Sequence, residues 1–388
     1  MDFTHQKLIN LIDNSLKNIP YEVPLTMEDF LLLRYNQLSG ISYPILRKQN
    51  EEVLEKFRKE YFLYIKRDEL QKRIISNLRD IFNRRNIDFI FLKGSYLKTI
   101  YPRSSMRVMG DIDVLVKSDR MSDIHKILTE NGYKNWSNST NHDCFYKERI
   151  NVEIHPKLDS EFEKGYEKLF LSPWEYVKHF EKNEYLLSIE YNFVYQVYHM
   201  IKHIYHSGVG YRTIVDFYVF FKANLKSFDL VEYQKIYQLF PKKEFLDYVV
   251  SLIDNLFSDI DLEKYLLSTK VNDSSYNDFI NFLFNSGTHG INEKHNLFIG
   301  GLANKSKNKK TTFFSKIQFL FSKVFLDLKT MKGMYKYLNK YPILLPFAWV
   351  QRIFRLVFRK NSRSKLKRLH IKNEDIDSVK HLFTKIGI

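Results

Sequence analysis

The sequence predicts an α+β fold, in which a small mixed sheet is flanked by an N-terminal helical lobe and a larger C-terminal helical region. Apolar residues recur at helical spacing through residues 1–85, strand-like patterns dominate residues 86–158, and helical spacing returns from residue 159. A chain of 388 residues is long enough for two or three cores. We divide the remainder into a helical domain (159–300) and a basic helical C-terminal region (301–388).

The N-terminal lobe carries its helical signal in two runs, LLLRYNQL and VLEKFRKEYFLYIKRDELQKRIISNLRDIF. In both runs apolar side chains return every three or four residues, which aligns them on one face of a helix. We therefore expect an all-helical lobe that ends near residue 85.

The central α/β module begins with NIDFIFL, a short and mostly apolar strand near residues 87–92. Gly94 and Ser95 then open a helix, SYLKTIY, and the segment GDIDVLV forms the next strand. A helix over SDRMSDIHKILTENGY leads to a further strand, NVEIHPKL. The expected order is strand, helix, strand, helix, strand.

Acidic residues mark one face of two of these strands. Successive side chains of a strand point to opposite faces, so Asp111 and Asp113 share one face. The same alternation puts Glu153 and His155 on one face of the later strand. Like charges this close repel each other unless a cation lies between them, and carboxylate oxygens together with substrate phosphates suit Mg²⁺. The pattern predicts a magnesium-dependent site for nucleotide phosphates.

A phosphate-binding turn precedes the acidic strand. Gly94 permits close approach of a phosphate to the main chain, Ser95 adds a hydroxyl donor, and the start of the following helix attracts anions. Lys93, Arg103 and Arg107 supply positive charge nearby in the sequence. We expect these five residues to bind the nucleotide.

These residues resemble the polymerase-β-like nucleotidyltransferase superfamily, whose pattern is Gly-Ser at a strand-to-helix turn, an Asp-x-Asp strand and one further acid on a later strand. More narrowly, four features resemble an uncharacterised bacterial nucleotidyltransferase family: KGSYLKTIYPRSSMRVMGDIDVLV, ENGY, His142 and VEIHPKL. The likeness continues in YHMIKHIYHSGVGYRTIVDFYVF and, more weakly, in LPFAWVQRIFRL. It covers most of residues 85–220 and a short stretch near 341–356.

The resemblance implies transfer of a nucleoside monophosphate from an NTP to an acceptor, with release of pyrophosphate. It implies two Mg²⁺ ions bridged by Asp111 and Asp113, with Glu153 holding the ion that activates the acceptor hydroxyl. The glycine-serine turn would hold the β- and γ-phosphates. Lys93 departs from the wider superfamily, where many members carry an apolar residue, and it either contacts a phosphate or closes the turn.

Further polar residues are assigned to a supporting layer of the site or to the acceptor side. His155 shares the face of the third acid, and we favour a supporting role for it over proton transfer. His199 and His203 are four residues apart on a predicted helix, where they are structural or bind zinc with a third partner; we favour the first. Arg212 and Asp216 form a helical ion pair, or Arg212 faces a phosphate of the nucleotide or acceptor.

The region after residue 159 opens with SPWEY, in which serine and proline are typical of a helix start. Its helices are expected to build the wall that faces the acceptor. Residues 285–310, NSGTHGINEKHNLFIGGLANKSKNKK, are rich in Gly, Asn and Lys and predict a linker or mobile loop.

Positive charge is concentrated at the C-terminal end. Residues 301–388 hold 21 Lys and Arg against 4 Asp and Glu, a balance of +17, whereas the whole chain carries +16. This surface contacts anionic lipid or nucleic acid, or is a solvated helical face, and we favour lipid over nucleic acid. Residues 313–331 alternate apolar stretches with lysines as an interfacial helix does, and YPILLPFAWV is too short to span a membrane.

The single cysteine, Cys144, excludes an internal disulfide, and the polar start MDFTHQKLINLIDN lacks a signal-peptide pattern. We expect a cytoplasmic protein, with peripheral contact to the inner membrane surface as a variant. The favoured activity moves an NMP to a hydroxyl or phosphate of a sugar, peptide or other small acceptor. The alternatives are transfer to RNA or to a protein side chain, and an inactive, membrane-associated module that binds nucleotide. The acceptor, the base and the oligomeric state are not predicted.

Overall fold

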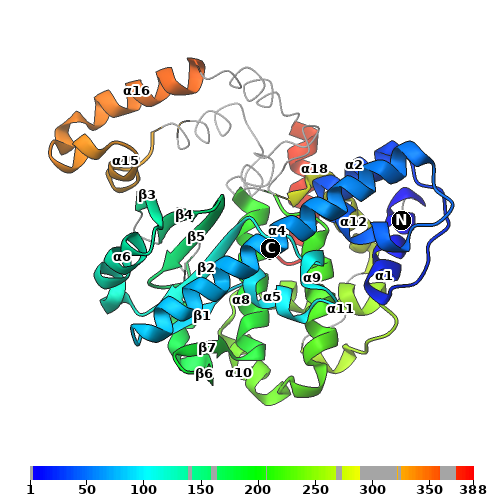
Figure 1. Cartoon of the computed structure of the whole chain (residues 1–388). Coiled ribbons are helices and arrows are strands. Elements are labelled where there is room, and N and C mark those ends of the chain that lie inside the picture. The colour runs from blue at the N-terminus through cyan, green and yellow to red at the C-terminus, as the bar shows by residue number, and fades with distance from the viewer. Residues whose placement is uncertain are drawn as a thin grey trace.

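One seven-stranded mixed sheet lies among helices (Figure 1), which confirms the predicted α+β class. The structure is a computed structural model. It describes residues 3–138, 142–158, 164–206, 208–267, 273–288, 321, 325–358 and 373–388.

Helices alone precede the sheet. A capping box, in which the side chains of Thr26 and Asp29 each accept from the other's backbone N–H, starts the second helix. Asn50 caps the long helix α4 by accepting from the N–H of Glu52. The elements are α1 (Phe3–Lys17), α2 (Met27–Tyr35), α3 (Ser39–Ser42), η1 (Tyr43–Ile45) and α4 (Glu51–Arg84).

The sheet has the strand order β3-β4-β5-β2-β1-β7-β6, and β2–β5 and β1–β7 are its parallel pairs. The short helices α5 and α6 connect its early strands. The bounds are β1 (Phe89–Phe91), α5 (Gly94–Ile100), η2 (Ser104–Met106), β2 (Asp111–Val116), η3 (Ser118–Arg120), α6 (Met121–Glu130), β3 (Lys134–Asn138), β4 (Asp143–Lys147), β5 (Ile150–His155), β6 (Val177–Glu181) and β7 (Glu184–Leu187).

The expectation of helices alone after residue 159 is wrong, because β6 and β7 form a hairpin that extends the sheet beyond β1. The segment SPWEY starts only one 3-10 turn, η4 (Pro173–Tyr176), before β6. Nearly all of β6 is exposed, so this edge strand buries no apolar face and shows no alternation of apolar and polar residues. Lys182 turns the chain between the strands with a positive φ of 50°.

The two faces of the sheet belong to different cores. Ile112, Val114 and Ile154 pack with residues of α4 and α6, such as Leu78 and Leu128. The opposite face, which includes Ile90 and Leu115, joins a much larger core built with the C-terminal helices. The alternation of β2 and β5 therefore turns the acids away from the smaller core.

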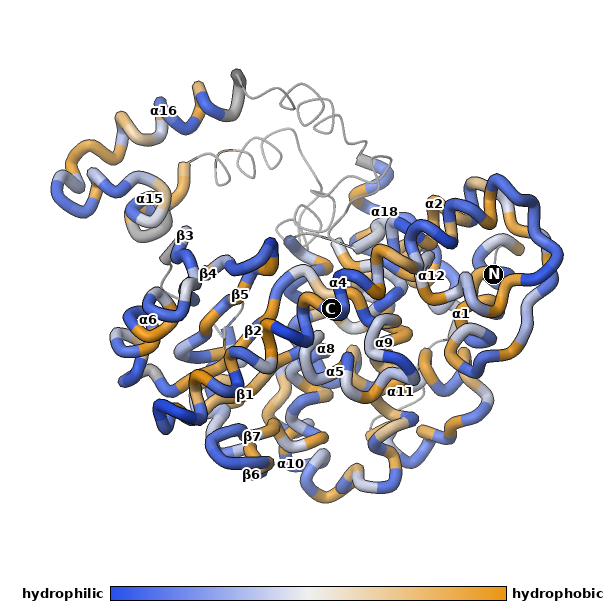
Figure 2. The backbone as a smooth tube through the Cα atoms, in the orientation of Figure 1, coloured by the Kyte–Doolittle hydropathy of each residue, from blue (hydrophilic) through white to orange (hydrophobic). Residues whose placement is uncertain are grey.

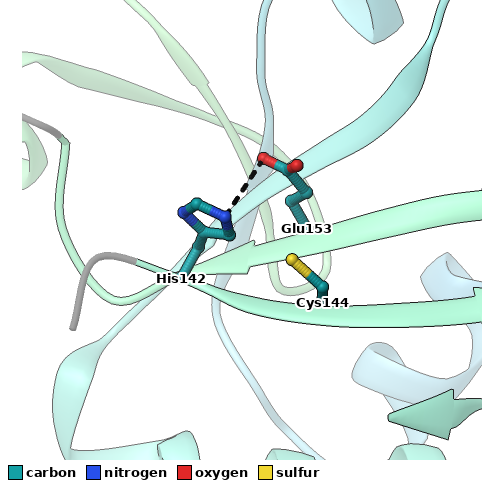
Figure 3. Close-up of side chains that lie close together, drawn as sticks. All are labelled: His142, Cys144 and Glu153. Carbon is teal, nitrogen blue, oxygen red and sulfur yellow. Dashed lines mark ion pairs between the residues drawn. The ribbon is translucent and has the colours of Figure 1, made fainter. Parts of the chain in front are cut away.

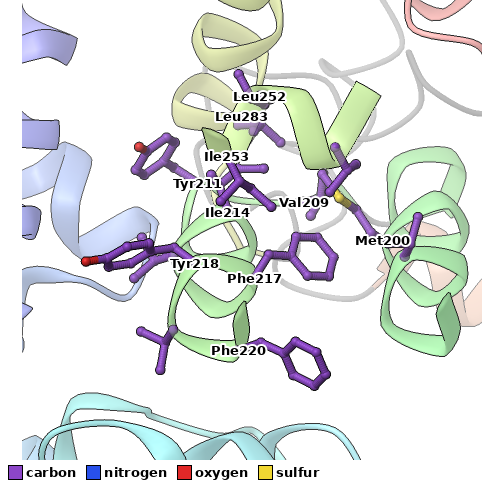
Figure 4. Close-up of a cluster of buried hydrophobic side chains, with 14 of the residues drawn as sticks. Met200, Val209, Tyr211, Ile214, Phe217, Tyr218, Phe220, Leu252, Ile253 and Leu283 are labelled. Carbon is purple, nitrogen blue, oxygen red and sulfur yellow. The ribbon is translucent and has the colours of Figure 1, made fainter. Parts of the chain in front are cut away.

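The larger core is centred on α8 and α9, with close-packed aromatic and aliphatic side chains (Figure 4). The N-terminal lobe shares it, because Asn36 bonds both the N–H of Tyr211 and the carbonyl of Phe284. The C-terminal helix α18 adds Ile376 and Phe383. The remaining bounds are α7 (Glu167–Phe170), α8 (Ile189–His206), α9 (Arg212–Asn224), η5 (Leu225–Ser227), α10 (Leu230–Leu239), α11 (Lys243–Leu256), η6 (Glu263–Tyr265), η7 (Asp273–Ser275), α12 (Tyr276–Ser286) and α18 (Asn373–Lys385).

A small helical unit with its own core lies apart from the rest (Figure 2). It comprises α15 (Leu328–Met334), η9 (Lys336–Asn339), η10 (Pro342–Leu344) and α16 (Leu345–Phe358). Most of the predicted linker 285–310 and of the interfacial segment 313–331 lies outside the described residues. Among the described helices, none combines the length and the apolar character needed to cross a bilayer.

Replacing Asp68 should destabilise the fold, because Asp68 is the counter-charge of Lys98, whose side chain is only 4% exposed. Asp68 also accepts from Ser104 Oγ at 2.7 Å, so the pair joins α4 to the turn after α5. We expect Asp68→Asn to lower the free energy of unfolding by roughly 3 kcal/mol. Lys72→Ala, which removes the exposed partner of Asp68, should cost less than about 1 kcal/mol. Denaturant unfolding measures both, and equal effects would contradict the buried-pair account.

Candidate active site

Three carboxylates meet on one face of two neighbouring strands. The parallel pairing of β2 with β5 places Asp113 directly opposite Glu153, and Asp111 lies two residues earlier on β2. All three line a cavity of about 380 Å³ between the sheet and α8 and α9. The structure thus brings together the acids that the sequence analysis selected.

Lys93 reaches these acids from the turn between β1 and α5. Its Nζ donates to Asp113 Oδ1 at 2.9 Å. The backbone of Lys93 has φ 48° and ψ −115°, a conformation that residues other than glycine rarely adopt. Strain of this kind persists where surrounding contacts fix the residue, and here the ion pair is one such contact.

His155 approaches Asp113 from β5. Its Nε2 lies 3.0 Å from Asp113 Oδ1 and 3.5 Å from Glu153 Oε2. Lys93 and His155 thus both bind Oδ1 of Asp113. Within the described part of the chain, Asp113 Oδ2 has no such partner, so this oxygen remains for a ligand in the cavity.

The pKa values divide the acids into two kinds. Burial alone would raise the pKa of Asp113, but Lys93 and His155 outweigh it and hold the pKa well below its ordinary value. The pKa of Glu153 is likewise lowered against burial, chiefly by its hydrogen bond with His155. Burial and the charges of Glu153 and Asp113 raise the pKa of Asp111 to about 6. The repulsion among the three carboxylates is therefore least compensated at Asp111.

The donor set fits a divalent cation. Ligand atoms of Asp113, Glu153 and His155 all lie within 4.8 Å of one another. A second group of this kind consists of His142, Cys144 and Glu153 (Figure 3). Burial raises the pKa of the Cys144 thiol to about 12, so the thiol is protonated, and burial lowers the pKa of His142. The oxygen-rich group suits the hard cation Mg²⁺ better than the sulfur-containing one.

The two residues of the predicted phosphate turn differ in their position relative to the cavity. Gly94 lines the cavity, and a Cβ at this position would lie 2.8 Å from the side chain of Met109, so any larger residue would require Met109 to move. Ser95 is buried with its hydroxyl 3.8 Å from Met109 Sδ, and it is not among the described residues that line the cavity. Gly94, and not the Ser95 hydroxyl, therefore lies at the surface of the cavity.

Of the two arginines after the turn, the structure brings Arg107 to the cavity and not Arg103. Arg107 Nε lies 2.6 Å from Asp216 Oδ1, which also accepts from Tyr101 at 2.6 Å. This network ties α9 to the loop before β2, and it replaces the predicted ion pair between Asp216 and Arg212.

Arg212 instead donates to the carbonyl of Val108 at 3.0 Å and to Gln37. Burial and the nearby Arg107 lower the pKa of Arg212 to about 10. Arg212 still lines the cavity, so its positive charge lies beside the candidate nucleotide site.

One face of α8 forms the wall opposite the acids. His199 and His203 line it, with their Nε2 atoms 3.1 Å apart. Among the described residues, the groups able to hold a metal do not include this pair. Tyr195 and Lys202 of α8 also line the cavity, and neither was predicted from the sequence. Positions 195, 199, 202 and 203 follow helical spacing, a signal that was present in the sequence.

Two adjacent acidic strands, with a lysine-glycine turn beside them in one cavity, define a site of the nucleotidyltransferase class. The chain belongs to a family described as uncharacterised nucleotidyltransferases, whose model matches residues 30–258, more than half of the sequence. This finding confirms the family resemblance. No curated protein and no solved structure matches the chain.

Divalent-metal affinity should fall as the pH is lowered through 6, because a proton on Asp111 competes with the metal. With a pKa of about 6, Asp111 is mostly ionised at pH 7.5 and mostly protonated at pH 5. We expect its protonation alone to weaken Mn²⁺ binding about tenfold over that interval, measured by calorimetry.

In Asp111→Asn, the affinity for Mn²⁺ should depend less on pH. We expect the remaining pH dependence to come from protonation of His155. Asp123→Asn, the same change on an exposed residue of α6, should behave as wild type. A full wild-type pH dependence in Asp111→Asn would contradict this assignment.

Proposed function

We propose that this protein is a metal-dependent nucleotidyltransferase that moves an NMP from an NTP to a hydroxyl or phosphate of a sugar, peptide or other small acceptor. One observation carries the proposal: three carboxylates from neighbouring strands line the same cavity as Lys93 and Gly94. The cavity volume of about 380 Å³ is of the size that small-molecule sites have, which favours a small acceptor.

Asp111, Asp113 and Glu153 are the residues that would hold two Mg²⁺ ions. When bound, such ions neutralise phosphate charge and lower the pKa of an acceptor hydroxyl. The oxygen donors on one face, and the Asp113 oxygen that Lys93 and His155 leave open, support this assignment.

The chain's own residues contribute mainly by position and charge. Lys93 and His155 fix the orientation of Asp113, so the carboxylate needs no rearrangement when a nucleotide arrives. Gly94 lets a phosphate approach the backbone, and Arg107 and Arg212 add positive potential to the cavity.

The polar face of α8 is the proposed acceptor wall. Tyr195, His199, Lys202 and His203 lie across the cavity from the acids and offer hydrogen-bonding groups and positive charge. A phosphate-bearing or hydroxyl-rich acceptor matches that chemistry. We place the enzyme in the cytoplasm, because its proposed donor is an NTP and its one cysteine forms no internal disulfide.

The first test is turnover and nucleotide binding in Asp111→Asn/Asp113→Asn. Wild type should bind an NTP in a Mg²⁺-dependent manner and release pyrophosphate when a suitable acceptor is added. The double variant should lose about three orders of magnitude or more in rate, because the metal ligands are gone. Calorimetry with each NTP and a coupled pyrophosphate assay measure these effects.

Asp123→Asn serves as the matched control, since it makes the same change outside the cavity. Metal-dependent binding without pyrophosphate release, across sugar, peptide and RNA acceptors, would favour an inactive binding module. NTP binding that is unchanged in the double variant would overturn the assignment of the site.

Lys93→Met and Ser95→Ala should differ in effect. Lys93→Met removes a charge bonded to Asp113, so we expect a loss of about a hundredfold in kcat. Ser95→Ala removes a hydroxyl that does not reach the cavity, and less than about tenfold should be lost. Steady-state kinetics measure kcat for both variants. A larger loss in kcat for Ser95→Ala than for Lys93→Met would show that the hydroxyl contacts substrate.

A further inference from the structure

Helix α16 has two apolar faces: one packs into the small core, and the side chains of the other are largely exposed. Leu345, Ala348 and Trp349 point to the small core, where they pack with Met331 and Leu338. Trp349 Nε1 also donates to the carbonyl of Leu326 at 2.8 Å, which fixes the helix on this unit. The helix therefore has a defined orientation, and its opposite face is turned outward.

The outward face carries large apolar side chains. Ile343, just before α16, is 86% exposed, and Phe347, Val350 and Phe354 are 62%, 48% and 58% exposed. The spacing of Phe347, Val350 and Phe354 aligns these three side chains along one face of α16, and Ile343 precedes them in η10. Single exposed apolar residues are common, but a continuous stripe of this kind marks an interaction surface. We call these four residues the α16 stripe.

Positive charge accompanies the stripe. Residues 325–358 contain six Lys and Arg and one acid, Asp327. Lys336 and Lys340 lie in and after η9, and Arg355 follows the last phenylalanine of the stripe; all three are exposed. A partner for this surface must offer apolar material and negative charge together. The surface of an anionic bilayer offers both.

The dimensions of the unit fit a position in the plane of the membrane. Helix α16 has 14 residues, whereas a membrane span needs about 20. A short helix with an apolar stripe and flanking cations lies along the interface, with the stripe among the acyl chains and the cations at the phosphates.

We propose that the α16 stripe docks this protein onto anionic membrane surfaces. The apolar side chains provide the insertion, and Lys336, Lys340 and Arg355 provide the preference for anionic lipid. The stripe lies outside the candidate active site, so the docking is independent of the proposed activity.

Co-sedimentation of the full chain with vesicles tests the docking. The chain should bind vesicles of phosphatidylcholine with 30% phosphatidylglycerol, bind pure phosphatidylcholine more weakly, and lose affinity as salt rises. Phe347→Glu/Phe354→Glu should reduce binding to the anionic vesicles by about tenfold or more. Lys340→Glu/Arg355→Glu, which alters only exposed charges, should abolish the preference for the anionic vesicles.

The matched control is Phe62→Glu/Leu63→Glu, which introduces the same charges at two exposed apolar residues of α4. This control, and Asp111→Asn/Asp113→Asn, should bind vesicles as wild type does, which separates docking from the active-site assignment. Equal loss in the α4 variant would overturn the proposal, because a general charge effect would explain it.

Two other occupants of the stripe would also overturn the proposal. If a second copy covers it, light scattering without lipid should show a dimer that Phe347→Glu/Phe354→Glu dissociates. If nucleic acid is the partner of the basic surface, the chain should bind RNA but not the anionic vesicles. A monomer that binds the vesicles through Phe347 and Phe354 is the expected result.

Discussion

Mutual repulsion among three carboxylates is the constraint on which the rest of this site depends. Asp111, Asp113 and Glu153 lie on one face of adjacent strands, largely withdrawn from water, where each charge raises the energy of the others. Lys93 and His155 offset that repulsion at one oxygen of Asp113. The rest of the repulsion acts on Asp111, whose pKa it raises, together with burial, to about 6. Lys93, whose backbone has a positive φ, is held in place in part by its ion pair with Asp113.

The helical parts complete this site rather than merely surround it. Asp216 on α9 holds Arg107 at the cavity, and Asn36 joins the N-terminal lobe to the chain just before α9. Helix α8 supplies the wall that faces the acids. A sheet with three acids on one face needs such neighbours to exclude water from that face. The family match, which extends from residue 30 to residue 258, spans all of these parts.

The sequence alone could predict the acidic face, because strand alternation is a local rule that Asp111, Asp113 and Glu153 obey. It could not predict which cations reach that face, since this depends on packing between distant segments. Arg103 and Arg107 are near in sequence, yet only Arg107 lines the cavity. The hairpin β6–β7 escaped prediction because an exposed edge strand has no apolar pattern. The division into residues 1–85, 86–158, 159–300 and 301–388 stays a prediction.

The parallel pairing of β2 with β5 also affects the order in which the parts of the site can assemble during synthesis. His155 is 42 positions beyond Asp113, and α8 and α9 follow later still along the chain. A nascent polypeptide that has exposed only β2 carries two acids without their third partner, their histidine or their wall. Contacts between such distant segments form late in folding. The cavity that the acids line is therefore incomplete until synthesis has passed residue 216, because Asp216 pairs with Arg107, and Thr288 lines the cavity later still along the chain.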